Sequence, residues 1–389
     1  IVSSYVLLYV FVGIMVLKIV GAYFKTRRVG ELAGYILASI ILALFFYGSV
    51  DPKELELIAE ISSILIVFHA GLTSDFSEVL GNLKKALFIS VTAVGFTFAI
   101  IFSSLYYLGL PLEVSLMIAI LFSNTATETT ALVLEKLGLE LKNLLISASF
   151  IDDVIVLFLA IVYFNLLRGV GYVDLITSLS ISIGVFALVL QLGMRRDLVA
   201  GFFAKISKSY ETFVDSTILI LTGLVVLFII FKGSGLIAGY LAGLFLSMGS
   251  SIKDPFLRFR SKIIDFSIML DSFIDSMFIP MFLLYVSLFV IKPGINMFLV
   301  VVVFTGAVIG KFIPYFFFMF RDKRFKNNAV LAGICMSGRG VLEMVLVIYA
   351  MNLGLLHDDM VNTVLAASVL TSLFAMISTS GLHEKMRIS

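Results

Sequence analysis

The 389-residue sequence has no tryptophan, one cysteine (Cys335), six prolines and three histidines, and only 14% of its residues are charged. A single cysteine excludes an intramolecular disulfide. The net charge of +2 gives no electrostatic basis for binding nucleic acid. A soluble domain of this length needs many more charged residues to cover its surface, so the composition argues against a soluble protein.

Hydrophobic residues make up 60% of the chain, and the mean hydropathy is +1.12. Long apolar runs in such a composition predict an all-α membrane protein with helices in lipid. We expect about thirteen spans, at about 1–23, 31–49, 56–73, 86–108, 112–135, 144–167, 171–194, 212–231, 234–250, 263–291, 296–320, 328–352 and 359–381. The connection 195–211 is the longest, and its pattern is amphipathic.

The basic residues give this span count a topology. With the N-terminus outside, 21 of the 28 Lys and Arg residues fall in cytoplasmic loops and four fall in external loops. The remaining three, Lys18, Lys311 and Arg339, fall inside spans. Because cytoplasmic loops are enriched in Lys and Arg, this asymmetry predicts an external N-terminus and a cytoplasmic C-terminus in the cell membrane.

Two segments resemble each other and indicate an internal repeat. Gly30–Ala38 opens the second span and Gly235–Gly243 opens the ninth, each with an Ala-Gly-Tyr sequence and small residues four apart. Spans two and nine are seven apart in the order of spans, an odd number, so the two copies enter the membrane from opposite sides. This predicts inverted six-helix repeats at 1–170 and 212–389, joined by a linker at 171–211.

Asp152 and Asp153 lie near the middle of the sixth span. An ionised carboxylate at that depth costs about 2.5–3.5 kcal/mol, so the pair requires a partner, a proton or a water-filled cavity. Neighbouring residues point about 100° apart on a helix, so the two aspartates are expected to face different surroundings. Lys311 is the candidate partner, because it lies about 15 Å from the cytoplasmic end of its span, too far for its side chain to reach the interface.

Spans five and twelve each carry a polar interruption. Ser123–Thr130 includes Thr125, Thr127 and Glu128, and Ser337–Gly340 includes Arg339 and is followed by Glu343. Matched breaks in two repeats are typical of an ion site at the membrane midplane. We therefore expect broken helices at about 112–135 and 328–352, with Glu128 and Arg339 offsetting the dipoles of the half-helices and Glu343 as a further supporting charge.

Other polar residues leave alternatives open. Asp271 and Asp275 form either an acidic funnel for cations or a solvated helix end. His69 is either a packed histidine or a proton relay. No metal-ligand cluster, phosphate loop or nucleophile–histidine pattern is visible, and adjacent aspartates do not suit an intramembrane aspartyl protease, so an enzyme is not expected.

Together these residues resemble the monovalent cation:proton antiporter superfamily, in its branch with an Asp-Asp pair that is related to potassium-efflux exchangers. The resemblance covers nearly the whole chain. It is carried by Phe68–Asp75, Thr125–Thr127, Asp152-Asp153, Phe278–Phe282, Lys311, and Gly338–Gly340 with Glu343. Glu128, and Thr73 and His69 in the third span, depart from the family pattern.

The resemblance implies electrogenic exchange of Na⁺ or Li⁺ for H⁺ by an elevator mechanism in a homodimer in the lipid bilayer. It implies a Na⁺ site at Asp153 and Asp152, helped by oxygens of Thr125, Thr127 and Ser149 and needing no cofactor. Lys311 is expected to pair with Asp152 and to release it when the cation binds. The absence of a nucleotide-binding domain before Ser389 favours Na⁺ over regulated K⁺ export. The alternatives are K⁺/H⁺ exchange on the same scaffold or Na⁺-coupled symport of an organic anion.

Overall fold

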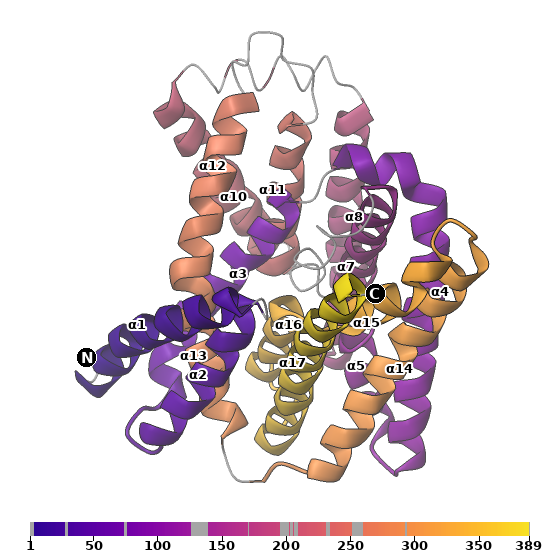
Figure 1. Ribbon diagram of the computed structural model, residues 1–389. Coiled ribbons are helices and arrows are strands. Elements are labelled where there is room, and N and C mark those ends of the chain that lie inside the picture. The colour runs from indigo at the N-terminus through magenta and orange to yellow at the C-terminus, as the bar shows by residue number, and fades with distance from the viewer. Residues whose placement is uncertain are drawn as a thin grey trace. The chain divides into compact units, whose positions relative to one another are not determined.

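We obtained a computed structural model that describes residues 4–27, 30–73, 76–125, 139–169, 171–194, 202, 205, 209–230, 234–250, 260–291 and 294–388. Every regular element within these ranges is a helix (Figure 1). Nine of the helices in the described residues are long and apolar enough to cross a membrane, which makes the chain a multi-pass membrane protein. Three further apolar helices are shorter: Glu31–Phe45, Leu112–Leu121 and Gly235–Met248. The count of thirteen spans stays a prediction.

The chain forms two compact units. The first consists of Ile1–Ala59, Asn82–Leu167 and Pro280–Ser389, and the second of Glu60–Gly81 and Arg168–Ile279. Each unit draws on both predicted repeats. A division into compact units does not test the order and direction in which helices cross the membrane. The repeat boundaries and the inverted relation between the repeats therefore also stay predictions.

The first unit contains most of the long helices. They are α1 (Ser4–Thr26), α2 (Glu31–Phe45), α4 (Phe76–Tyr107), α5 (Leu112–Leu121), α7 (Leu139–Leu167), α13 (Ile279–Val290), α14 (Met297–Arg321), α15 (Ala329–Ser337), α16 (Val341–Asn352) and α17 (Asp358–Ile388), with short 3₁₀ helices at Pro52–Leu55 and Lys326–Asn328. Helices α14, α15 and α17 pack on one another, and α5 packs on α7 (Figure 1). Asn296 caps α14 by accepting a hydrogen bond of 3.2 Å from the backbone N–H of Leu299.

The second unit is arranged around α11 (Gly235–Ser250). Helices α8 (Tyr172–Met194), α10 (Tyr210–Ile230) and α12 (Arg260–Phe273) each contact α11. The remaining partner is α3 (Glu56–Thr73), whose backbone comes so close that a Cβ on Gly243 would lie 2.0 Å from the carbonyl oxygen of Phe68. Gly239 lies similarly close to Ile64. The small residues of the Ala-Gly-Tyr segment therefore serve close helix packing, as the sequence indicated.

The predicted tenth span, 263–291, is not one uniform helix. A π-helix at Ile274–Phe278 separates α12 from α13, and Pro280 is the second residue of α13. Proline has no backbone N–H to donate to the preceding helical turn, and its ring clashes with a carbonyl group of that turn. A wider turn at this point avoids both the clash and a carbonyl without a hydrogen bond. Asp275 lies within the π-helix.

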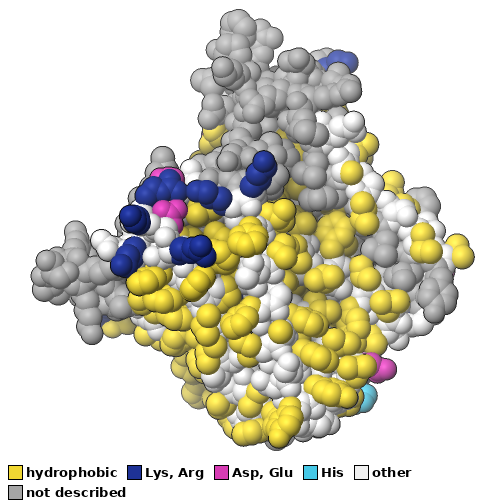
Figure 2. Space-filling view, turned by 90° about the vertical axis from the view of Figure 1, so that its right-hand side faces the viewer, with side chains coloured by type: hydrophobic (Ala, Val, Ile, Leu, Met, Phe, Trp, Pro, Cys, Tyr) yellow, Lys and Arg dark blue, Asp and Glu magenta, His cyan; other side chains and the backbone are white. Residues whose placement is uncertain are grey.

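The described surface has the pattern expected of a protein in lipid. Figure 2 shows hydrophobic side chains spread over one face, with Lys and Arg side chains gathered toward one edge. Exposed aromatic residues such as Phe88 (63%) and Phe317 (56%) lie on α4 and α14. Basic residues flank the membrane segments of the same two helices: Lys84, Lys85, Arg321, Lys323, Arg324 and Lys326, all of them exposed.

The contact between α3 and α11 generates a test of the fold. Replacing Gly243 with Ala should destabilise the protein by about 1–3 kcal/mol, because neither backbone can move without disturbing the other helix. Gly223 of α10 provides the matched control, because a Cβ there has nothing within 4 Å. Thermal unfolding in detergent should show a lower Tm for Gly243→Ala and an equal or higher Tm for Gly223→Ala. Equal Tm values for Gly243→Ala and the wild type would contradict the packing.

Candidate functional site

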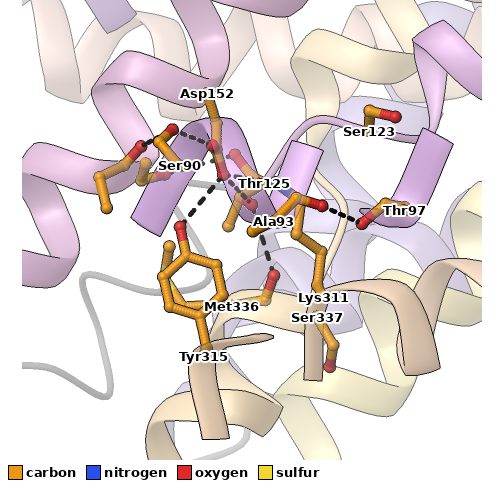
Figure 3. Close-up of polar contacts among 12 residues, drawn as sticks. Ser90, Ala93, Thr97, Ser123, Thr125, Asp152, Lys311, Tyr315, Met336 and Ser337 are labelled. Atoms are coloured by element: carbon orange, nitrogen blue, oxygen red, sulfur yellow. Dashed lines mark hydrogen bonds and ion pairs between the residues drawn. The ribbon is translucent and has the colours of Figure 1, made fainter. Parts of the chain in front are cut away.

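The carboxylate of Asp152 is the centre of a buried polar cluster in the first unit (Figure 3). Its Oδ2 accepts hydrogen bonds from Lys311 Nζ at 2.5 Å, Thr125 Oγ1 at 2.7 Å and Tyr315 OH at 3.3 Å. Its Oδ1 accepts a hydrogen bond from the hydroxyl of Ser90. All five side chains are buried, and they come from α4, α7, α14 and the segment after α5.

Lys311 is held inside the protein and does not reach toward an interface. Its side chain and that of Asp152 are both 0% exposed. Helix α14 comes close to α4 because Gly306 and Gly310 face Ile101 and Thr97, where a Cβ would have no room. The contact that the resemblance implied between Lys311 and Asp152 is therefore present.

Asp153 occupies different surroundings from its neighbour. It is 6% exposed, whereas Asp152 is 0% exposed. The four donors described above are directed at Asp152, as expected from the rotation of about 100° between successive helical residues. Asp152 is thus fixed by four protein donors, and Asp153 lies on an adjacent face of α7.

The second predicted helix break is present. Helix α15 ends at Ser337, residues 338–340 are not helical, and α16 begins at Val341. The first break begins where expected, since α5 ends at Leu121. Thr127 and Glu128 lie outside the described residues, so the far side of that break stays a prediction.

Arg339 joins the C-terminal ends of α5 and α15. Its Nη2 donates to the carbonyl oxygens of Phe122 at 2.6 Å and Ala307 at 3.1 Å, and its Nη1 donates to that of Ser337 at 3.2 Å. Phe122 is the C-cap of α5, and Ser337 is the last residue of α15. A cation at two helix C-termini offsets the negative ends of both dipoles and satisfies carbonyls that have no intrahelical partner.

Glu343 completes this arrangement with the opposite charge. It lies in the first turn of α16, where the helix dipole favours an anion. Its Oε2 is 3.6 Å from Arg339 Nε, and both side chains are 0% exposed. Arg339 and Glu343 therefore lie where dipole compensation requires them.

The other predicted site residues are found in two places. Ser149 Oγ donates to the carbonyl oxygen of Thr125 at 3.4 Å, which ties α7 to the unwound segment. In the second unit, Asp271 Oδ1 lies 3.1 Å from Nε2 of His69, and the Asp271 side chain is 65% exposed. His69 is thus packed beside a carboxylate. The funnel role of Asp271 and Asp275 stays a prediction.

Three members of the cluster were not anticipated from the sequence. Tyr315 follows Lys311 by one helical turn, so the sequence already placed the two side chains on the same face of the helix. Ser90 and Ser372 carried no such signal, because single serines are common in apolar helices. Ser372 Oγ donates to the carbonyl oxygen of Arg339 at 2.6 Å and so fixes the second break from α17.

Comparison with known proteins identifies the family. The transmembrane sodium/hydrogen exchanger family matches residues 9–385 of the sequence. This chain belongs to the sodium/hydrogen exchanger family. Membership of this family makes the chain a membrane transporter and not an enzyme.

One similar protein matches part of the sequence, and one solved structure matches the fold of nearly the whole chain. A glutathione-regulated potassium-efflux system protein from Haemophilus influenzae is 30% identical over 119 residues, which cover 30% of this chain and 19% of that protein. The structure of the sodium proton antiporter MjNhaP1 from Methanocaldococcus jannaschii at pH 8 matches with a TM-score of 0.71 at 14% identity, covering 98% of this chain and 97% of that one. The second comparison shows that the exchanger has an antiporter fold.

The environment of Arg339 generates a prediction. Arg339→Gln should destabilise the exchanger by about 3–5 kcal/mol, because it leaves the buried Glu343 carboxylate uncompensated. Thermal unfolding of Arg339→Gln and of the double variant with Glu343→Gln measures this effect. The double variant should be the more stable of the two.

Arg324→Gln is the matched control, because Arg324 binds Glu140 and Asp322 on the surface and its removal should leave Tm nearly unchanged. An Arg339→Gln variant as stable as Arg324→Gln would show that the buried contacts do not stabilise the fold.

Proposed function

We propose that this exchanger trades one Na⁺ or Li⁺ for two protons, with Asp153 as the principal cation ligand and Asp152 as its partner. The observation that carries the proposal is the buried pair of carboxylates, in which Asp152 is held by the buried Lys311 and by three further donors. A carboxylate beside a cation path can hold either a proton or Na⁺, so the two ions compete for one site. Such competition, at a site open alternately to each side, is sufficient for exchange.

Charge accounting supports electrogenic exchange. With Asp153 protonated and Lys311 paired to Asp152, the three groups sum to zero charge. If Na⁺ replaces the proton on Asp153, and Lys311 releases Asp152 and gives up its proton, the loaded site has a charge of −1. The two loaded states differ by one charge whichever group holds the second proton, because the three groups form a coupled set. This is the behaviour expected of the Asp-Asp branch of the cation:proton antiporters, to which we assign the exchanger.

We also propose an elevator motion in a homodimer, with the N-terminus outside the cell membrane. The division of the chain into two units supports the motion, since Asp152, Lys311, Thr125 and Arg339 all lie in the first unit. The site can then move as a body without being taken apart. The excess of Lys and Arg in alternate loops supports the orientation.

A K⁺/H⁺ exchanger is the second candidate. It is favoured by the similarity to a potassium-efflux protein, although that match covers 19% of the relative's length. Competition between Na⁺, Li⁺ and K⁺ in one proteoliposome assay separates the two. Transport of K⁺ in preference to Na⁺ would replace our assignment.

The first functional prediction concerns Asp153. Proteoliposomes with a pH gradient should show Na⁺-dependent proton movement, and Asp153→Asn should abolish it because the amide cannot exchange a proton for a cation. Asp215→Asn is the control, since Asp215 is an exposed carboxylate on α10 in the other unit. Full activity of Asp153→Asn would place the cation site elsewhere. No response of the wild type to Na⁺, Li⁺ or K⁺ between pH 5 and 9 would refute exchange itself.

The second functional prediction concerns charge. Exchange of two protons for one Na⁺ moves one net charge, which at 100 mV contributes about 2.3 kcal/mol per cycle. Na⁺ addition to proteoliposomes on a solid-supported membrane should therefore give a transient current. Its sign should reverse when the Na⁺ gradient is reversed. Proton movement without any current would show electroneutral exchange.

A further inference from the structure

The Oδ2 atom of Asp152 has more donors than it can bind well. A carboxylate oxygen offers about two lone-pair positions, yet three donors surround this atom. Lys311 and Thr125 are 2.5 and 2.7 Å away, whereas the Tyr315 hydroxyl is 3.3 Å away. The bond from Tyr315 is thus the weakest of the three while Lys311 is in place.

Tyr315 lies where its hydroxyl can form a stronger hydrogen bond to Asp152 Oδ2. It lies four residues after Lys311 on α14, so both side chains leave the same face of the helix toward Asp152 (Figure 3). Its side chain is 0% exposed, which keeps its hydroxyl away from bulk water. Asp153 and Arg339 are also close enough to act on the hydroxyl electrostatically, and the hydroxyl donates to Asp152.

We propose that Tyr315 is a positioning residue that acts as a reserve donor: its hydroxyl takes the place of Lys311 on Asp152 Oδ2 whenever Lys311 is released. This inference rests on the proposed function, in which cation binding releases Lys311. Without a donor in addition to Thr125, release would leave this buried carboxylate oxygen with one hydrogen bond instead of two, which costs free energy. Tyr315 lowers that cost and so makes cation binding easier, without contacting the cation.

The transport test uses Tyr315→Phe, which removes only the hydroxyl. Because a hydrogen bond to a charged group is lost in the released state, the apparent KM for Na⁺ should rise at least about tenfold, and the pH at which exchange is half-maximal should shift. Tyr9→Phe is the matched control: Tyr9 is a buried tyrosine of the same unit whose hydroxyl donates to the carbonyl oxygen of Leu284 at 2.8 Å. Its removal should leave the KM unchanged. An unchanged KM in Tyr315→Phe would overturn the proposal.

A stability test does not depend on transport. In the wild type, Tyr315→Phe should change Tm little, because Lys311 and Thr125 already satisfy Oδ2. In a Lys311→Met background the reserve bond is in use, so Tyr315→Phe should lower Tm further, by at least about 3 °C. Equal shifts in both backgrounds would show an ordinary structural hydroxyl and would overturn the proposal.

The transport test and the stability test distinguish failure of the proposed function from failure of the reserve-donor proposal. If the wild type exchanges no cation, the proposed function fails, while the stability comparison still decides whether Tyr315 replaces Lys311. If the wild type exchanges normally and the KM of Tyr315→Phe is unchanged, the reserve donor alone is refuted. The KM comparison needs no Lys311 variant, so it stands even where Lys311→Met does not fold.

Discussion

The ion pair between Lys311 and Asp152 is the interaction on which the rest of the site depends. Both side chains are completely buried, so the pair is costly to desolvate and repays that cost only with good geometry and further hydrogen bonds. Those bonds come from Ser90 and Thr125. The requirement to satisfy one carboxylate thus fixes α4, the end of α5, α7 and α14 relative to one another, and the glycines of α14 permit the necessary closeness.

The C-terminal ends of α5 and α15 need hydrogen-bond donors and a positive charge, and Arg339 supplies both. Helices α5 and α15 both end inside the protein, which leaves their last carbonyl groups without intrahelical partners among buried residues such as Phe122 and Ser337. One guanidinium, with five donors in a fixed plane, meets carbonyls from α5, α14 and α15 at once. A lysine cannot do the same, because its single ammonium group lacks this spread. The unwound backbone beside Asp152 is therefore stable, and Thr125 is free to direct its hydroxyl at the carboxylate.

Much of this arrangement was predictable because charge inside a membrane is so unfavourable. Asp152, Lys311 and Arg339 stand out in an apolar sequence for that reason alone, and their pairing or capping roles follow from what each must find. The second break was predictable from the glycines around Arg339. The π-helix before Pro280 was not predicted as such, although the proline marked an irregularity. Ser90 and Ser372 were beyond prediction, since their importance comes from tertiary contacts that leave no trace in local sequence.

The asymmetry between the two aspartates has a consequence for how an exchange cycle works. A carboxylate with four donors is a poor place for a cation, because each donor must be displaced before Na⁺ can approach. Asp152 is better suited to store and return a positive charge through Lys311 than to bind the ion first. The buried ion pair is strong enough to hold the site together when no cation is bound. The reserve donor Tyr315, on the same helix as Lys311, allows the pair to separate when a cation arrives.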